Sequence, residues 1–243
     1  MSARARQGLR RGTGREVAYQ MLRARILDLT LEPGAPLDEA VLVRELQLSR
    51  TPLREAFVRL ASENLVELLP NRGARVAEIT VTQLSQYFEA LALMQRATHR
   101  WAATRRSAKD LREIAVHRDA FANGARQDTV KIPALNRAFH AAIAACCGNG
   151  HVTKIYHELL DQGLRLARLT VDRETSSADT PEMHAETLIA EHAAIFDAIA
   201  RQDAEAADHL AASHNDLFRR RVYEYFVNRR NAPADLVTLA ASG

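Results

Sequence analysis

The sequence of 243 residues predicts a mainly α-helical protein in two parts: three helices with a β-hairpin, then an all-α antiparallel bundle. Three observations predict this fold class. Apolar residues recur at helical spacing over most of the chain. Two β-prone runs, 65–69 and 74–79, flank a turn rich in Pro, Asn and Gly. After Ile79 the β signal stops and alanine becomes abundant, which favours helices.

The first two helices are short and separated by a turn. Apolar residues recur at helical spacing from Ala18 to Leu29, and Pro33-Gly34 then breaks the pattern. Asp38 can cap a second helix because its carboxylate accepts from backbone N–H groups of the first turn. The polar link 47–49 ends this helix.

A third helix follows at once. Thr51 suits its N-cap and Pro52 its first helical position, where a missing N–H costs nothing. Asn64 tolerates the left-handed conformation and can close the helix. The buried stripe is expected to comprise Leu53, Phe57 and Leu60. Three helices followed by a hairpin give the order of a winged helix-turn-helix domain over residues 15–79.

Residues 80–230 are expected to form the helical bundle. Thr80 with Gln83 makes a capping box for its first helix, and Ser107 can cap the second. Four further helical periods begin at Val130, His151, Pro181 and Asp203. The sequence thus predicts six helices, with a basic arm at 1–14 and a tail at 231–243.

Composition and charge narrow the class of protein. No apolar run approaches the roughly 18 residues that cross a bilayer, and no signal peptide is evident, so we expect a cytoplasmic protein without a membrane partner. The adjacent Cys146 and Cys147 are too few for a disulfide framework. Residues 1–75 carry 13 basic against 9 acidic side chains, although the whole chain has a net charge of only +3. The positive front half favours nucleic acid as a partner.

The third helix carries the candidate DNA contacts. A recognition helix presents donor-rich side chains at its N-terminal end, which enters the major groove. Arg50, Thr51 and Arg54 lie there, and Arg54 faces away from the buried stripe. Guanidinium groups at these positions can reach guanine O6 and N7 or phosphate oxygens.

These residues resemble a known family. Residues 48–56, LSRTPLREA, followed by residues 70–76, PNRGARV, are similar to the winged-helix signature of GntR-family transcriptional regulators. The resemblance implies DNA contacts from Arg50, Thr51 and Arg54. It also implies a wing tip at Arg72-Gly73 and a further contact from Arg44.

The bundle carries a candidate metal site. His140, His192 and His214 each lie on an apolar helical face at i,i+3 or i,i+4 spacing, and Asn136 precedes His140 by one turn. Several inward imidazoles cost roughly 1–3 kcal/mol each unless their nitrogens are satisfied, and metal ligation uses their lone pairs. Zinc ranks first because it favours imidazole, while nickel and manganese also fit. Glu191 is expected outside the pocket, about 100° around the helix from His192.

The same segments resemble the FCD-type effector domain of the FadR subfamily within the GntR regulators. With six helices the bundle is similar to the shorter, VanR-like group. The resemblance implies that residues 136–140, then Glu191-His192, then His214 supply the metal and ligand site. The chain departs from the family pattern, which has aspartate at the position of Asn136, and arginine and glutamate where this chain has Leu91 and Gln95.

The residues therefore predict a ligand-responsive regulator, a homodimer that represses transcription from palindromic operator DNA. A neutral donor set leaves a bound ion its full charge, so we expect a small carboxylate effector, with Arg165 and Arg168 as candidate anchors. Two alternatives stay open. One is a dedicated metal sensor, in which the ion itself is the signal. The other is a metal-dependent enzyme with a water in the open coordination position.

Overall fold

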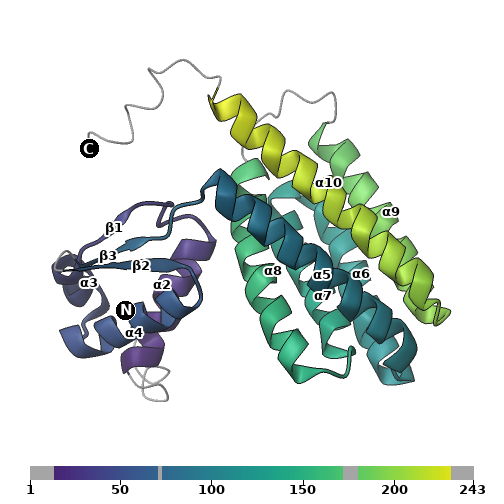
Figure 1. Ribbon diagram of the computed structural model, residues 1–243, viewed down its shortest axis with the longest axis horizontal. Helices are drawn as coiled ribbons and strands as arrows, with labels where there is room; N and C mark the ends of the chain where they lie inside the picture. The colour runs from purple at the N-terminus through teal and green to yellow at the C-terminus, as the bar shows by residue number, and fades with distance from the viewer. Residues whose placement is uncertain (1–13, 71–72, 172–179, 231–243) are drawn as a thin grey trace. The chain divides into compact units, whose positions relative to one another are not determined.

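A computed structural model describes residues 14–70, 73–171 and 180–230 of the chain (Figure 1). Most of the expected basic arm and the whole expected C-terminal tail lie outside these residues. The chain divides into two compact units, Met1–Leu84 and Ser85–Gly243. The first unit ends five residues after the expected boundary at Ile79.

The first unit joins three helices to a small antiparallel sheet. Its elements in chain order are α2 (Gly14–Leu27), β1 (Pro36–Leu37), α3 (Glu39–Leu46), α4 (Arg50–Ser62), β2 (Val66–Leu69) and β3 (Gly73–Val76). The sheet order is β1-β3-β2, and β2 pairs with β3 in the register Val66 with Val76. The expected hairpin is thus present. The third strand, β1, was not predicted, because two residues are too few to show an alternating pattern.

The core of this unit lies between α2 and α4, which pack against each other. Its central side chains are fully buried and recur at helical spacing on both helices: Ala18, Leu22, Ile26, Leu53, Phe57 and Leu60. The buried stripe of α4 is the one predicted. This packing fixes which face of α4 remains exposed to solvent.

The ends of the short helices follow local side-chain chemistry. Asp38 caps α3 as predicted, since its side chain accepts from the N–H groups of Ala40 and Val41. Asn64 adopts the left-handed conformation, φ 57°, just after α4. The predicted start of α4 was wrong: Ser49, with extended backbone angles, is the N-cap, and the helix begins at Arg50. Pro52 still fits there, because N–H groups of the first turn have no intrahelical acceptor.

The second unit contains six α-helices in the part of the chain that the structure describes. They are α5 (Val81–Arg105), which begins in the first unit, α6 (Ala108–Gln127), α7 (Ile132–Ala145), α8 (Gly150–Val171), α9 (Pro181–Ala200) and α10 (Ala204–Arg230). A 3-10 turn, η2 (Thr129–Lys131), precedes α7. Both predicted caps are present: Thr80 and Gln83 bond reciprocally, and so do Ser107 and Asp110. None of the described helices is long and apolar enough to cross a membrane.

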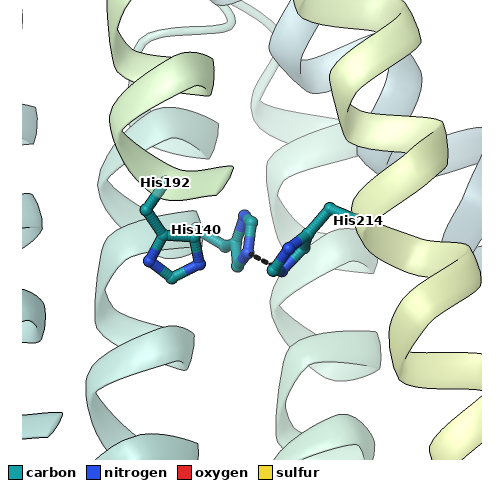
Figure 2. A group of neighbouring side chains, drawn as sticks. All are labelled: His140, His192 and His214. Carbon is teal, nitrogen blue, oxygen red and sulfur yellow. Dashed lines mark hydrogen bonds between the residues drawn. The ribbon is translucent and has the colours of Figure 1, made fainter. Parts of the chain in front are cut away.

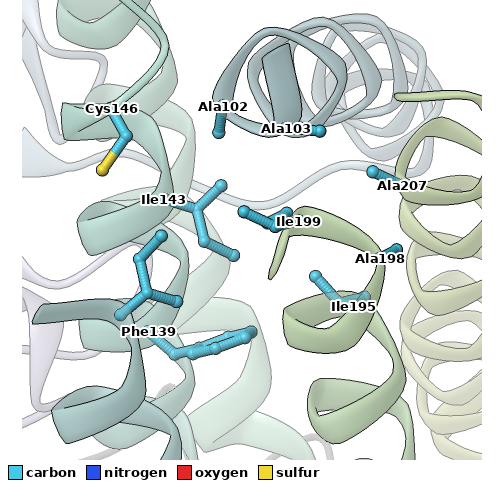
Figure 3. Packing of buried hydrophobic residues seen from close by; sticks show 10 residues of the cluster. Ala102, Ala103, Phe139, Ile143, Cys146, Ile195, Ala198, Ile199 and Ala207 are labelled. Atoms are coloured by element: carbon cyan, nitrogen blue, oxygen red, sulfur yellow. The ribbon is translucent and has the colours of Figure 1, made fainter. Parts of the chain in front are cut away.

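The bundle core surrounds the helices that carry the candidate histidines. α7 packs against α6 and α8, and α9 packs against α6 and α10. Figure 3 shows one buried cluster, in which Phe139 and Ile143 of α7 face Ile195 and Ile199 of α9. Small residues of α5 and α10, such as Ala103 and Ala207, complete this cluster. Close packing of this kind leaves the side chains that border the cluster little freedom to move.

Candidate functional site

The N-terminal end of α4 presents the predicted DNA contacts to solvent. Arg50, Thr51 and Arg54 are all exposed, while Leu53 between them is buried. Nε of Arg54 donates to both carboxylate oxygens of Glu39, at 2.9 and 3.1 Å, yet the Arg54 side chain stays 65% exposed. Glu39 thus holds the guanidinium of Arg54 in place across the junction of α3 and α4.

The other two predicted contact regions are less fully described. Arg44 is exposed on α3, and its Nε donates to the carbonyl of Ala40. Gly73 begins β3 at φ +81°, and a Cβ added there would meet no atom within 4 Å. The wing tip is therefore open at Gly73, and its left-handed backbone favours glycine. Arg72 lies outside the described residues.

Three histidines from three helices converge inside the second unit. Figure 2 shows the rings of His140 from α7, His192 from α9 and His214 from α10 facing one another. All three are buried, and one ring nitrogen of each lies within 4.8 Å of the others. Nε2 of His140 lies 3.0 Å from Nε2 of His214. Oδ1 of Asn136 lies 3.0 Å from Nε2 of His192, so the structure brings together all four predicted ligands.

The apolar core holds His192 between two aromatic rings. The imidazole stacks on Phe139, with ring centroids 4.3 Å apart, and its centroid lies 4.2 Å from that of Phe121. Nδ1 of His192 is buried and has no hydrogen-bond partner among the described residues. A buried polar atom left unpaired costs roughly 1–3 kcal/mol, so this ring suits a ligand that satisfies it.

Burial sets the charge of two of these rings. It lowers the pKa of His140 and of His192 well below the ordinary value, and the neighbouring histidines lower both further. Neutral imidazoles each keep one nitrogen lone pair, which is the form that binds a metal ion. With an imidazole nitrogen of His214 and the amide oxygen of Asn136, these two neutral rings make a donor set that fits a divalent transition-metal ion.

Two further residues contact the histidines of this centre. Glu191, which the family resemblance implies, is not among the described residues that line the cavity, but its Oε2 lies 2.6 Å from Nδ1 of His214. The angle between Glu191 and His192 on α9 says nothing about α10, whose approach brings His214 to the carboxylate. His99 of α5 was not predicted, and its Nε2 lies 3.2 Å from Nδ1 of His140. Its signal was the i,i+4 series Leu91, Gln95 and His99, in which polar residues interrupt the apolar pattern.

A cavity opens beside the histidines, with a volume of about 70 Å³. A water molecule needs only about 10–15 Å³ by the same measure, so the cavity admits a small organic molecule. Asn136, His140 and His214 form part of its wall. Its apolar lining includes Leu91, Ile132, Pro133, Leu160, Leu164, Leu188 and Phe218.

Two arginines line this cavity, although not the two expected. Arg137 and Arg221 belong to the lining, and Nε of Arg137 also donates to Asp161 at 2.5 Å. Arg165 is buried, which lowers the pKa of its guanidinium to about 10, and Arg168 is half-buried. Neither Arg165 nor Arg168 is among the lining residues in the described part of the chain. The spacing along α8 could not show which face meets the cavity.

The cavity wall contains buried polar atoms with which a ligand can form hydrogen bonds. Nε2 of Gln95 and Oδ1 of Asn215 are buried without a hydrogen bond among the described residues, and both residues line the cavity. His184 also lines it, and burial lowers the pKa of its ring to about 4. A polar ligand can satisfy the two amides, which an apolar ligand cannot.

Both parts of the chain match families of known proteins. Residues 15–76 match the bacterial regulatory proteins of the gntR family, and residues 86–217 match the FCD domain. The chain belongs to the GntR family. This GntR regulator is 30% identical to the galactonate operon transcriptional repressor of Escherichia coli (strain K12), over 74% of this chain and 83% of that protein. It is 26% identical to the transcriptional repressor RspR of the same organism, over 81% and 83%.

Solved structures show the same fold. Escherichia coli McbR/YncC aligns with a TM-score of 0.75 at 21% identity, covering 88% of this chain and 99% of that chain. The two family models show that the GntR regulator is a DNA-binding transcriptional regulator with a winged helix-turn-helix and an FCD domain, as the sequence predicted. Because the family consists of regulators, the alternative of a metal-dependent enzyme is set aside.

Proposed function

We propose that this regulator binds a divalent metal ion and a small carboxylate in its helical domain, and that both control its binding to operator DNA. Asn136, His140, His192 and His214 would hold the ion, with zinc ranked first and nickel or manganese as alternatives. The observation that carries the proposal is the convergence of three buried histidines, two of which, His140 and His214, line a cavity. A bound ion would supply positive charge there and orient an anionic ligand.

Charge supports a carboxylate as the effector. Three neutral imidazoles and an amide leave a divalent ion its full charge, which an anion can offset. Arg137 and Arg221 line the same cavity and suit a carboxylate, because a guanidinium presents paired donors to it. One relative is named for the galactonate operon, and galactonate is itself a carboxylate.

The DNA-binding mode follows from the size of the reading element. One winged helix contacts too few base pairs for useful specificity, so we expect a homodimer that reads a palindromic operator through two α4 helices. Arg44, Arg50, Thr51 and Arg54 would contact DNA from α3 and α4, with Arg72 and Gly73 at the wing tip. The names of two relatives favour a repressor. We expect this regulator to act in the cytoplasm, where operator DNA is available to it.

Thermal unfolding with chelator, with zinc, and with zinc plus small carboxylates tests this proposal. A ligand that binds only the folded state raises the melting temperature. We expect zinc to raise it in the wild type, and one or more carboxylates to raise it further only when zinc is present. His140→Ala should lose both effects, whereas His151→Ala, which changes an exposed histidine on α8, should keep them.

DNA binding separates this proposal from the dedicated metal sensor. Fluorescence anisotropy on a duplex selected from random sequence measures operator affinity with zinc alone and with zinc plus the stabilising carboxylate. A response to the carboxylate supports an organic effector. A response to zinc alone, unchanged by any carboxylate, supports the metal sensor, and no response to either overturns the proposal.

A further inference from the structure

His99 continues the row of buried histidines on the side away from His214. It is fully buried on α5, and its ring makes polar contacts through both nitrogens. Nδ1 lies 3.3 Å from Oγ1 of Thr98. The ring also makes a hydrogen bond to the backbone of Gln95. Nε2 lies 3.2 Å from Nδ1 of His140. His99 therefore contacts a predicted metal ligand without being one of the ligands.

The hydrogen bonds around Thr98 fix the position of one proton. The Thr98 hydroxyl donates to the carbonyls of Met94 and Gln95, at 2.8 and 2.9 Å. Its single hydrogen is used there, so Oγ1 offers only an acceptor to His99. With this acceptor at Nδ1, His99 carries its hydrogen on Nδ1, and its Nε2 keeps a lone pair.

The same reasoning then applies to His140. The lone pair of His99 Nε2 must accept from Nδ1–H of His140, because two facing lone pairs repel. A neutral imidazole has one N–H, so Nε2 of His140 has none and presents its lone pair. That Nε2 is the atom that lies 3.0 Å from Nε2 of His214.

On the side of the centre away from His99, Glu191 holds His214 in the Nδ1–H form, the same tautomer as that of His140. Its carboxylate accepts from Nδ1–H of His214 at 2.6 Å, which leaves Nε2 of His214 as the second donor atom. Both Nε2 lone pairs then face the same point, and a cation between them removes their repulsion. Hydrogen bonds to the outer nitrogen of a ligating histidine commonly fix its tautomer in this way.

We propose that His99, itself oriented by Thr98, is a positioning residue that fixes His140 as the Nδ1–H tautomer and so aims its Nε2 at the metal. The inference rests on the metal site of the proposed function, but the tautomer is a property of the metal-free protein as well. His99→Leu removes the acceptor at similar volume. His99→Gln can restore it, because the amide oxygen of glutamine can accept from Nδ1–H of His140.

Two measurements test the role of His99. Long-range proton–nitrogen correlation spectra of the metal-free protein, with nitrogen-15 in its histidines, report which nitrogen of His140 is protonated. Competition with a chromophoric chelator reports the zinc affinity. We expect Nδ1–H in the wild type and a mixture of tautomers in His99→Leu, with zinc affinity lowered about 10–100-fold. His99→Gln should restore the wild-type tautomer and most of the affinity.

A control variant separates this role from packing. Tyr156 packs edge-on against His99, with centroids 6.5 Å apart, and its buried hydroxyl has no hydrogen-bond partner among the described residues. Tyr156→Phe should therefore leave both readings unchanged. A wild-type His140 protonated on Nε2, or an unchanged tautomer in His99→Leu, overturns the inference. Absence of zinc binding by a wild type with the expected tautomer overturns the metal site of the proposed function, and only the control of the His140 tautomer by His99 then stands.

Discussion

Replacing Asn136 with aspartate should tighten metal binding and weaken the binding of an acidic effector. Oδ1 of Asn136 lies 3.0 Å from Nε2 of His192, and Asn136 lines the cavity together with His140 and His214. The substitution keeps the size of the side chain and adds one negative charge to the donor set. That charge attracts the ion and repels any other anion that binds to it.

Coulomb's law gives the size of the effect. Two carboxylates bound side by side to one ion have charge centres about 4 Å apart, where two unit charges interact by about 4 kcal/mol at an effective dielectric constant of about 20. An energy of about 4 kcal/mol corresponds to roughly a thousandfold in affinity. Screening by solvent reduces it, so we expect the acid to bind Asn136→Asp between about tenfold and about a thousandfold more weakly.

Calorimetry on zinc-loaded protein measures this directly, with small carboxylates titrated into the wild type and Asn136→Asp. Chelator competition should show tighter zinc binding by the aspartate variant. Asn136→Ala is the control, because it removes the oxygen without adding charge and so weakens zinc binding without repelling the acid. Equal affinity of the two zinc-loaded proteins for the acid would refute the reasoning.

Three further predictions address the DNA interface, the core and the buried rings. Arg50→Ala and Arg54→Ala should each cost about 1–3 kcal/mol of operator binding in anisotropy titrations, with unchanged circular dichroism; a folded variant with wild-type affinity contradicts the assigned roles. Ile143→Ala should lower the free energy of unfolding by about 2–5 kcal/mol in urea denaturation, because Ile143 is fully buried. The control Val116→Ala, on the exposed face of α6, should change the free energy of unfolding by less than about 0.5 kcal/mol. Burial lowers the pKa of His99 from 6.5 to about 3. The contribution of the neutral ring to the free energy of unfolding is therefore complete above pH 6.5, and it is lost as the pH falls toward 3, by up to about 1.4 kcal/mol per pH unit. Urea midpoints of the metal-free protein that do not fall between about pH 7 and about pH 5 would contradict this.

Local chemistry explains why much of the fold could be predicted. Asp38, the Thr80 and Gln83 pair and Asn64 each act within a few residues of their own position, so their spacing along the chain is sufficient evidence. The buried stripes also follow from spacing, because one face of a helix repeats every three or four residues. The start of α4 at Arg50 was missed because Ser49 and Thr51 are both good N-cap residues.

The metal centre was predicted only in part, for a different reason. His140, His192 and His214 lie on apolar faces, which spacing reveals. Glu191 on α9 contacts His214 on α10, and His99 on α5 contacts His140 on α7. Both contacts join two different helices, and no pattern within one helix records them. The choice of Arg165 and Arg168 as anchors has the same explanation. Spacing shows that an arginine lies on a helix, but it does not show which face of that helix meets a cavity.

The zinc content of the purified protein, loaded with zinc, freed of unbound ions and analysed by mass spectrometry, tests the central claim most directly. The claim is that the buried histidines hold a divalent ion. The wild type and the surface control His151→Ala should retain equimolar zinc, and a variant with His140, His192 and His214 all replaced by alanine should retain none. A wild type that retains no zinc, nickel or manganese, or a triple variant that retains as much as the wild type, would contradict it.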